Sequence, residues 1–91
     1  MSDQGTSTSH SVHALFREGR LTTVPRKAAR REQVLTHLAR TLFERDRDYT
    51  EREVNDVLLT VHDDCAALRR YLIVAGLLTR TKDGGSYRRG R

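Results

Sequence analysis

The sequence predicts a mainly α domain of three helices followed by a small β-hairpin. Apolar residues recur at three- and four-residue spacings in three separate segments, which is the pattern of helices with one buried face. A Thr-x-x-Glu sequence opens the second segment, and this pairing is typical of a helix start. Beyond the third segment, residues 77–81 and 86–89 favour strands and flank a turn at 82–85. Helix, link, helix, tight turn, helix and hairpin is the order of a winged helix-turn-helix domain, in which the hairpin is the wing.

The first predicted helix covers residues 26–43. Its apolar stripe consists of Val34, Leu35, Leu38, Leu42 and Phe43. Basic residues gather in its first half, at Arg26, Lys27, Arg30 and Arg31. Positive charge at a helix N-terminus opposes the helix macrodipole. We therefore infer that something other than helix stability favours these residues.

The second and third predicted helices have clear start and stop signals. Thr50 and Glu53 fit a capping box, and the helix that they open ends between Thr60 and His62. The third helix begins after an aspartate N-cap, Asp63 or Asp64, and runs to Ala75. Residue 76 is glycine, the residue that most readily adopts the positive φ of a helix C-terminus.

One domain is expected, covering residues 12–89, between a leader at 1–11 and a tail at 90–91. The leader is polar, without hydrophobic periodicity, and is expected to be disordered. Residues 12–16 are a short apolar anchor, and residues 19–25 are predicted to be extended because Pro25 disfavours helix at Val24. Residues 44–48 form a charged connector, and Tyr49 after it is expected to be buried.

The composition points to a basic protein of the cytoplasm. Seventeen Lys and Arg against twelve Asp and Glu give a net charge of +5, and fifteen of the seventeen are arginines. Such a surplus favours binding to nucleic acid, although a solvated surface in an Arg-rich proteome would look the same. Cys65 is the single cysteine, so no intrachain disulfide forms. The N-terminus does not look like a signal peptide, and no apolar run approaches the ~20 residues of a membrane span.

Residues between Leu15 and Arg88 resemble a bacterial family known as domain of unknown function 2087. The resemblance is carried by Leu15-Phe16, Gly19-Arg20-Leu21, Pro25, Lys27, Tyr49-Thr50-Glu51, Glu53-Val54-Asn55, His62-Asp63-Asp64, Leu68-Arg69-Arg70, Leu72, Arg80, Gly84 and Tyr87. Members of that family are similar to winged-helix domains, and some are fused to helix-turn-helix regulators. The resemblance implies gene regulation by association and supplies neither a catalytic residue nor a ligand. The chain departs from it at Cys65, where an aromatic residue is expected.

The leading functional hypothesis is binding to double-stranded DNA. In a helix-turn-helix, the second helix of the motif enters the major groove, and here that helix is residues 64–75. The candidate DNA-binding residues are Arg69, Arg70, Arg80, Lys82, Arg88, Arg89, Arg26, Lys27, Arg30 and Arg31. Asp63 and Asp64 are an objection, because they place negative charge at the end of the helix that usually approaches DNA. An alternative for Arg69 and Arg70 is ion pairing, with Glu53, Asp56, Asp63 or Asp64 as partners.

Two further hypotheses, a metal site and a catalytic site, rest on the segment from His62 to Cys65. His62, Asp63 and Cys65, with His37, are metal-ligand types, but a closed zinc site needs four ligands and the chain offers no second Cys/His pair. A pair of His62 with either aspartate, or Cys65 as nucleophile, is the only catalytic arrangement in sight. Because the chain lacks a Gly-rich phosphate loop and its apolar stripe absorbs Cys65, we expect no enzyme activity, no metal and no cofactor.

The rival hypothesis is a protein-interaction module with a winged-helix fold and no direct contact with DNA. Winged-helix domains pair through their first helix or through flanking segments, and residues 12–21 form an arm suited to this. Val74, Leu77 and Leu78 together exceed what one small core is expected to cover. A homodimer or a regulator protein is the partner that this hypothesis predicts, and neither hypothesis involves a membrane.

Overall fold

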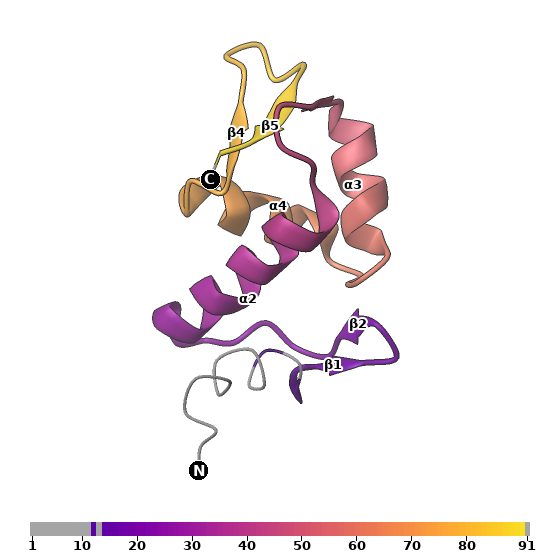
Figure 1. Ribbon diagram of the computed structural model, residues 1–91, viewed down its shortest axis with the longest axis vertical. Coiled ribbons are helices and arrows are strands. Elements are labelled where there is room, and N and C mark those ends of the chain that lie inside the picture. Colours follow the sequence, from indigo (N-terminus) through magenta and orange to yellow (C-terminus); the bar gives the residue numbers. More distant parts are fainter. Residues whose placement is uncertain (1–11, 13, 91) are drawn as a thin grey trace.

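The computed structural model describes residue 12 and residues 14–90, and its elements follow the predicted order (Figure 1). A short hairpin of β1 (Phe16–Arg17) and β2 (Arg20–Leu21) comes first, followed by α2 (Ala28–Leu42) and β3 (Asp48–Tyr49). The remaining elements are α3 (Glu51–Leu59), α4 (Cys65–Val74), β4 (Leu78–Arg80) and β5 (Tyr87–Arg89). The predicted leader at 1–11 and the last residue of the predicted tail lie outside the described residues. Gly90 donates its amide to the carbonyl of Leu77 at 2.8 Å.

The helices confirm the start and stop signals of the sequence. Helix α2 begins two residues later than predicted, because Lys27 is its N-cap and keeps an extended backbone. The capping box at the start of α3 is complete: the Glu53 amide donates to Thr50 Oγ1 at 3.1 Å, and the Thr50 amide to Glu53 Oε1 at 2.8 Å. Gly76 follows α4 with φ of 77°, the conformation predicted for it.

The β structure is richer than the single hairpin expected from the sequence, so the fold is a mixture of helices with two small antiparallel sheets. Strand β3, within what was predicted to be a charged connector, pairs with β5 and completes a three-stranded sheet of order β3-β5-β4. A hairpin alone is marginally stable in water, and the third strand covers one of its edges. The second sheet is the β1–β2 hairpin, whose turn at Glu18 and Gly19 has positive φ at both residues, as a type I′ turn requires.

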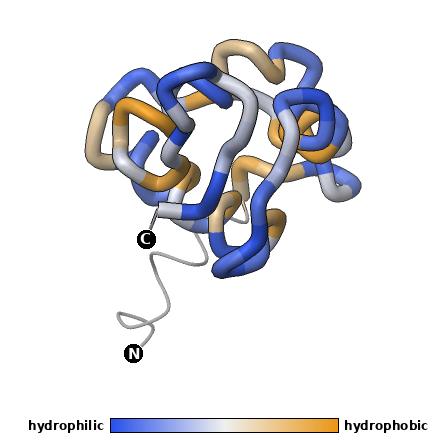
Figure 2. Tube along the Cα trace, turned by 90° about the horizontal axis from the view of Figure 1, so that it is seen from above, coloured by the Kyte–Doolittle hydropathy of each residue, from blue (hydrophilic) through white to orange (hydrophobic). Residues whose placement is uncertain are grey.

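One hydrophobic core joins the three helices, the three-stranded sheet and β2. Its members with almost no exposed surface are Val34, Leu35, Leu38, Ala39, Phe43, Tyr49, Val54, Leu58, Leu68, Leu72, Leu77, Leu78 and Tyr87. Burial of Tyr49 was predicted and is confirmed. Figure 2 shows hydrophobic stretches alternating with hydrophilic ones along the trace. Within the described part of the chain, no helix has the length and apolar character needed to cross a membrane.

Candidate nucleic-acid interface

Helix α4 is positioned by its buried face and by its N-cap. Leu68 and Leu72 are fully buried, and the Asp64 carboxylate accepts the amide of Ala67 at 3.0 Å. Residues four apart lie on one face of a helix. The exposed face of α4 is therefore the stripe of Ala66, Arg70 and Val74. We call these three residues the α4 stripe.

The two aspartates at the start of α4 are both engaged within the domain. Arg20 donates through one Nη atom to Asp63 Oδ1 at 2.5 Å, and the same side chain donates to the carbonyl of Leu59 at 3.0 Å. Asp64 serves as the N-cap. Because Arg20 brings a positive charge beside Asp63, the negative field at this helix end is weaker than the sequence alone implies. The pair is solvent-exposed, so its contribution to stability is small.

The two adjacent arginines of α4 have different roles. Arg69 is half-buried and donates to the side-chain oxygen of Asn55 on α3, so its guanidinium faces α3. None of the four acidic partners predicted for it is used. Arg70 is exposed and takes part in none of the hydrogen bonds or ion pairs among the described residues. Of the two arginines predicted to read DNA, the structure leaves Arg70 accessible.

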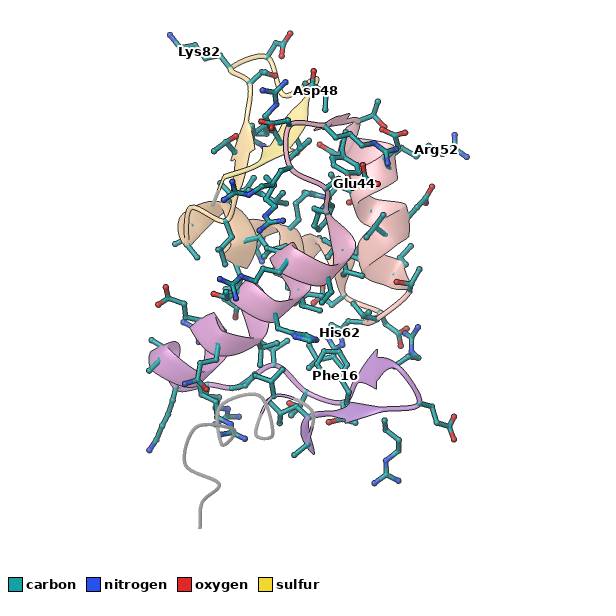
Figure 3. All side chains as sticks on the ribbon, viewed as in Figure 1. Phe16, Glu44, Asp48, Arg52, His62 and Lys82 are labelled. Atoms are coloured by element: carbon teal, nitrogen blue, oxygen red, sulfur yellow. The ribbon has the colours of Figure 1, made fainter. Side chains whose placement is uncertain are left out.

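The basic residues of the β4–β5 hairpin are of two kinds: some are exposed, and others form hydrogen bonds within the domain. Arg80 and Lys82 are exposed, and Lys82 extends from the tip away from the body of the domain (Figure 3). Arg88 instead donates to Asp48 on β3, with Nε and one Nη each 2.9 Å from Oδ1. Arg89 is half-buried and donates to the carbonyl of Phe43 at 3.4 Å. The tip of the hairpin is thus its accessible basic part.

The basic residues at the start of α2 form a separate group. Arg26 and Lys27 are exposed, whereas Arg30 and Arg31 are half-buried. Arg31 donates to the carbonyl of Arg26 at 2.9 Å, and its guanidinium lies 4.8 Å from the ring centre of Tyr71 on α4. Figure 1 shows α2 beginning in the lower part of the view and the hairpin tip at the top. The basic residues of α2 and those of the hairpin therefore lie at two ends of the domain, and Arg69 and Arg70 lie on α4.

A network of hydrogen bonds fixes the hairpin tip that carries Lys82. The Thr81 hydroxyl donates to Asp83 Oδ1 at 2.6 Å, and the Gly85 amide donates to the same oxygen at 2.9 Å. The Thr81 hydroxyl, followed by the Gly85 amide, holds the pKa of Asp83 below its usual value of 3.8. The carboxylate form of Asp83 therefore orders the turn.

We expect the hairpin tip to lose order as the pH falls through this lowered pKa. Because the folded-state pKa lies below the unfolded value, the contribution is complete above pH 3.8 and is lost on further acidification. Asp83→Asn should produce a similar loss at neutral pH. Amide hydrogen exchange of Gly85 measures both effects, with the amide of Val54 on α3 as the control. Equal protection of Gly85 in the variant and the wild type would contradict the assignment.

Within the described part of the chain, the residues proposed for metal binding are not gathered into a metal site. His62 Nδ1 lies 3.4 Å from the carbonyl of Leu21, and Cys65 is half-buried against the core. The described residues contain no group of three or more His, Cys, Asp or Glu side chains arranged to hold a metal ion. The second helix was predicted to end between Thr60 and His62. It ends at Leu59 with Thr60 as its C-cap, and the His62 amide donates to the carbonyl of Leu58 at 3.0 Å.

Three basic residues outside the predicted set also occupy positions of functional interest. Arg20 pairs with Asp63, while Arg40 and Arg45 line the same small cavity as Arg89. Arg40 is recognisable in the sequence as an exposed position of a predicted helix. Arg45 lies in the segment interpreted as a connector, and only the turn before β3 brings it next to Arg40.

Comparison with known families assigns most of the chain. The model of the DUF2087 family, described as uncharacterized proteins conserved in bacteria, matches residues 20–89. The chain belongs to the DUF2087 family. The match begins at β2 and extends to the end of β5, so this DUF2087 domain includes α2, α3, α4 and the whole three-stranded sheet. No match was found among the curated proteins or the solved structures.

Proposed function

We propose that this DUF2087 domain is a winged helix-turn-helix that binds double-stranded DNA as a small transcriptional regulator or as an accessory to one, without enzyme activity. The order α2-β3-α3-α4-β4-β5 supports it, with α3 and α4 packed together and the hairpin joined to β3. In this proposal α4 is the recognition helix, and the β4–β5 hairpin is the wing.

The single observation that carries the proposal is the set of accessible cations on α4 and on the hairpin that follows it. Arg70, Arg80 and Lys82 are exposed, and no hydrogen bond or ion pair within the described part of the chain engages them. Exposed guanidinium and ammonium groups without such contacts can bind phosphate oxygens or base edges. In the α4 stripe, Ala66 adds little bulk in the first turn, so the helix backbone can approach the groove closely.

Two cations at the start of α2 extend the proposed surface. The contact between Arg31 and Tyr71 brings this end of α2 beside α4, and Arg26 and Lys27 next to it are exposed. We assign Arg70 to the major groove, Arg80 and Lys82 to the DNA backbone on the wing side, and Arg26 and Lys27 to the backbone on the α2 side.

A salt titration tests the proposal. If the four cations assigned to the DNA backbone each neutralise one phosphate, the logarithm of the association constant falls with the logarithm of salt concentration at a slope of about −3.6. Fluorescence anisotropy with a labelled duplex at several salt concentrations measures this slope, and circular dichroism shows that the protein is folded. Absence of binding to any duplex at low salt would refute the proposal.

One observation favours the rival function, a protein-interaction module. Val74 on α4 is 81% exposed, and it lines a shallow cavity together with Tyr71 and Leu35. Two other residues proposed for such an interface do not favour it: Leu77 and Leu78 are core residues with 2% and 1% exposure. A complex that persists at high salt, measured by light scattering and weakened by Val74→Asp, would support the rival function.

A further inference from the structure

A cluster of three arginines lies away from the α4 stripe and the hairpin tip. Arg40 on α2, Arg45 in the following loop and Arg89 on β5 line one cavity of about 230 Å³, together with Thr36 and Leu77. We call this cavity the arginine pocket. No carboxylate is among its lining residues, and none of them belongs to α4. The lining of the arginine pocket is therefore basic, and it shares no residue with the surface proposed for the DNA groove.

Helix α2 and strand β5 form two walls of the arginine pocket, and both are ordered parts of the fold. Thr36 and Arg40 are four residues apart and share one face of α2. Arg89 belongs to β5, where it pairs in register with Leu78, and it donates to the Phe43 carbonyl. These two walls come from a helix and a sheet that share the hydrophobic core, so their spacing is fixed.

The loop that supplies Arg45 is also fixed. The Glu44 amide donates to the hydroxyl of Tyr49 at 2.8 Å, and the buried rings of Tyr49 and Phe43 make an edge-to-face contact with centroids 5.2 Å apart. Asp46 adopts φ of 60°, which reverses the chain between Phe43 and β3. Aspartate tolerates this conformation better than most residues. Arg45 is thus presented by a short loop that is tied down at both ends.

The charge of the arginine pocket favours an anionic partner. Guanidinium groups stay protonated at any physiological pH, so Arg40 and Arg45 place two positive charges at one cavity. Arg40 and Arg45 make no hydrogen bond or ion pair with other described residues. The neighbouring cavity of about 550 Å³, which shares the three arginines, does contain Glu44, Glu53 and Asp56, but Glu53 lies 3.8 Å from Arg47. The arginine pocket is therefore the side of the three arginines whose lining contains no acid.

We propose that the arginine pocket binds the phosphate group of a small phosphomonoester. A tetrahedral oxyanion with two charges matches several guanidinium forks, which bind phosphate oxygens in a bidentate manner. The Thr36 hydroxyl and the apolar wall of Leu77 complete the lining. Drug-sized ligands occupy ~300–1,000 Å³, so a pocket below that range fits a phosphate group and little more. This function adds a ligand site to the proposed DNA-binding domain and does not depend on DNA binding.

Inorganic phosphate is the probe for this proposal. We expect saturable shifts of the arginine Nε–Hε signals in ¹H–¹⁵N spectra at constant ionic strength, with chloride giving none. Arg40→Gln and Arg45→Gln should each weaken phosphate binding by about tenfold or more, since each removes one charge-assisted contact. Arg52→Gln is the matched control, because Arg52 is an exposed arginine on α3 that points away from the domain (Figure 3).

Two results of the phosphate titration would overturn the proposal. One is the absence of saturable shifts in the wild type, and the other is equal weakening by Arg52→Gln and Arg40→Gln, which would indicate diffuse attraction by the net charge. A duplex titration of the same variants separates this site from the DNA surface. The proposal expects Arg40→Gln and Arg45→Gln to keep wild-type affinity for the duplex. A loss as large as that caused by Arg80→Gln would show that the pocket belongs to the DNA-backbone surface, which overturns its assignment as a separate ligand site.

Discussion

Replacement of Tyr87 by alanine is expected to lower the free energy of unfolding by about 3–5 kcal/mol, the range for removal of a buried aromatic ring. Tyr87 is 1% exposed and lies on β5, in register with Tyr49 on β3 and with Arg80 on β4. Its ring therefore fills the core at the point where the three strands meet. For a domain of this size, such a loss lowers the melting temperature by more than ~10 °C. Thermal unfolding followed by circular dichroism measures it.

Tyr87→Phe is the matched control for this experiment. The Tyr87 hydroxyl donates to Glu51 Oε1 at 2.9 Å, in the first turn of α3, and phenylalanine removes only that bond. A single hydrogen bond contributes about 1 kcal/mol net, so Tyr87→Phe should keep most of the stability. A Tyr87→Ala protein as stable as Tyr87→Phe would show that the ring does not hold the sheet to the helices.

The long elements of the fold were predictable because several local signals agree in each of them. Helix α3 has a capping box and a single apolar face, and α4 has an aspartate N-cap and a glycine with positive φ after its end. The turn of the β4–β5 hairpin carries Gly84, again with positive φ. These signals involve residues that are close together in the sequence, so they can be recognised without knowledge of the tertiary structure.

Strand β3 escaped prediction because it depends on a distant partner. The strand consists of only two residues, Asp48 and Tyr49, and aspartate has a low strand propensity. Their pairing with Arg88 and Tyr87 becomes visible only when β5 lies beside them. The β1–β2 hairpin was not predicted for a different, local reason: Glu18 is an unusual residue for a turn position with positive φ.

The candidate site was predictable in residue type but not in accessibility. Ten basic residues were selected by charge and by position in the expected fold. Sequence cannot tell that Arg69 is bonded to Asn55, that Arg88 is bonded to Asp48, or that Arg89 faces a cavity with Arg40. Each of these contacts spans 14 or more residues along the chain. Tertiary contacts thus reduce the predicted surface to fewer accessible cations.

The accessible cations of the hairpin lead to the sharpest test of DNA binding. Simultaneous Arg80→Gln and Lys82→Gln is expected to reduce the magnitude of the salt slope by about 2, one for each phosphate that the variant no longer neutralises. Affinity at low salt should fall at least about tenfold, because each charge-assisted hydrogen bond to phosphate is worth more than a neutral one. The loss should be the same for duplexes of different sequence, since phosphate contacts carry no sequence information.

Arg70→Ala is expected to behave differently from the double variant of the hairpin. If Arg70 reads a base edge from the α4 stripe, its loss weakens binding to a preferred duplex by about 1–3 kcal/mol and leaves other duplexes nearly unaffected. A preferred duplex is obtained by selection from a random library. Arg88 is unsuited to this comparison, because its removal also leaves Asp48 without its partner. Arg52→Gln is the control, and losses in it equal to those in the hairpin variant would show that net charge, and not the wing, governs binding.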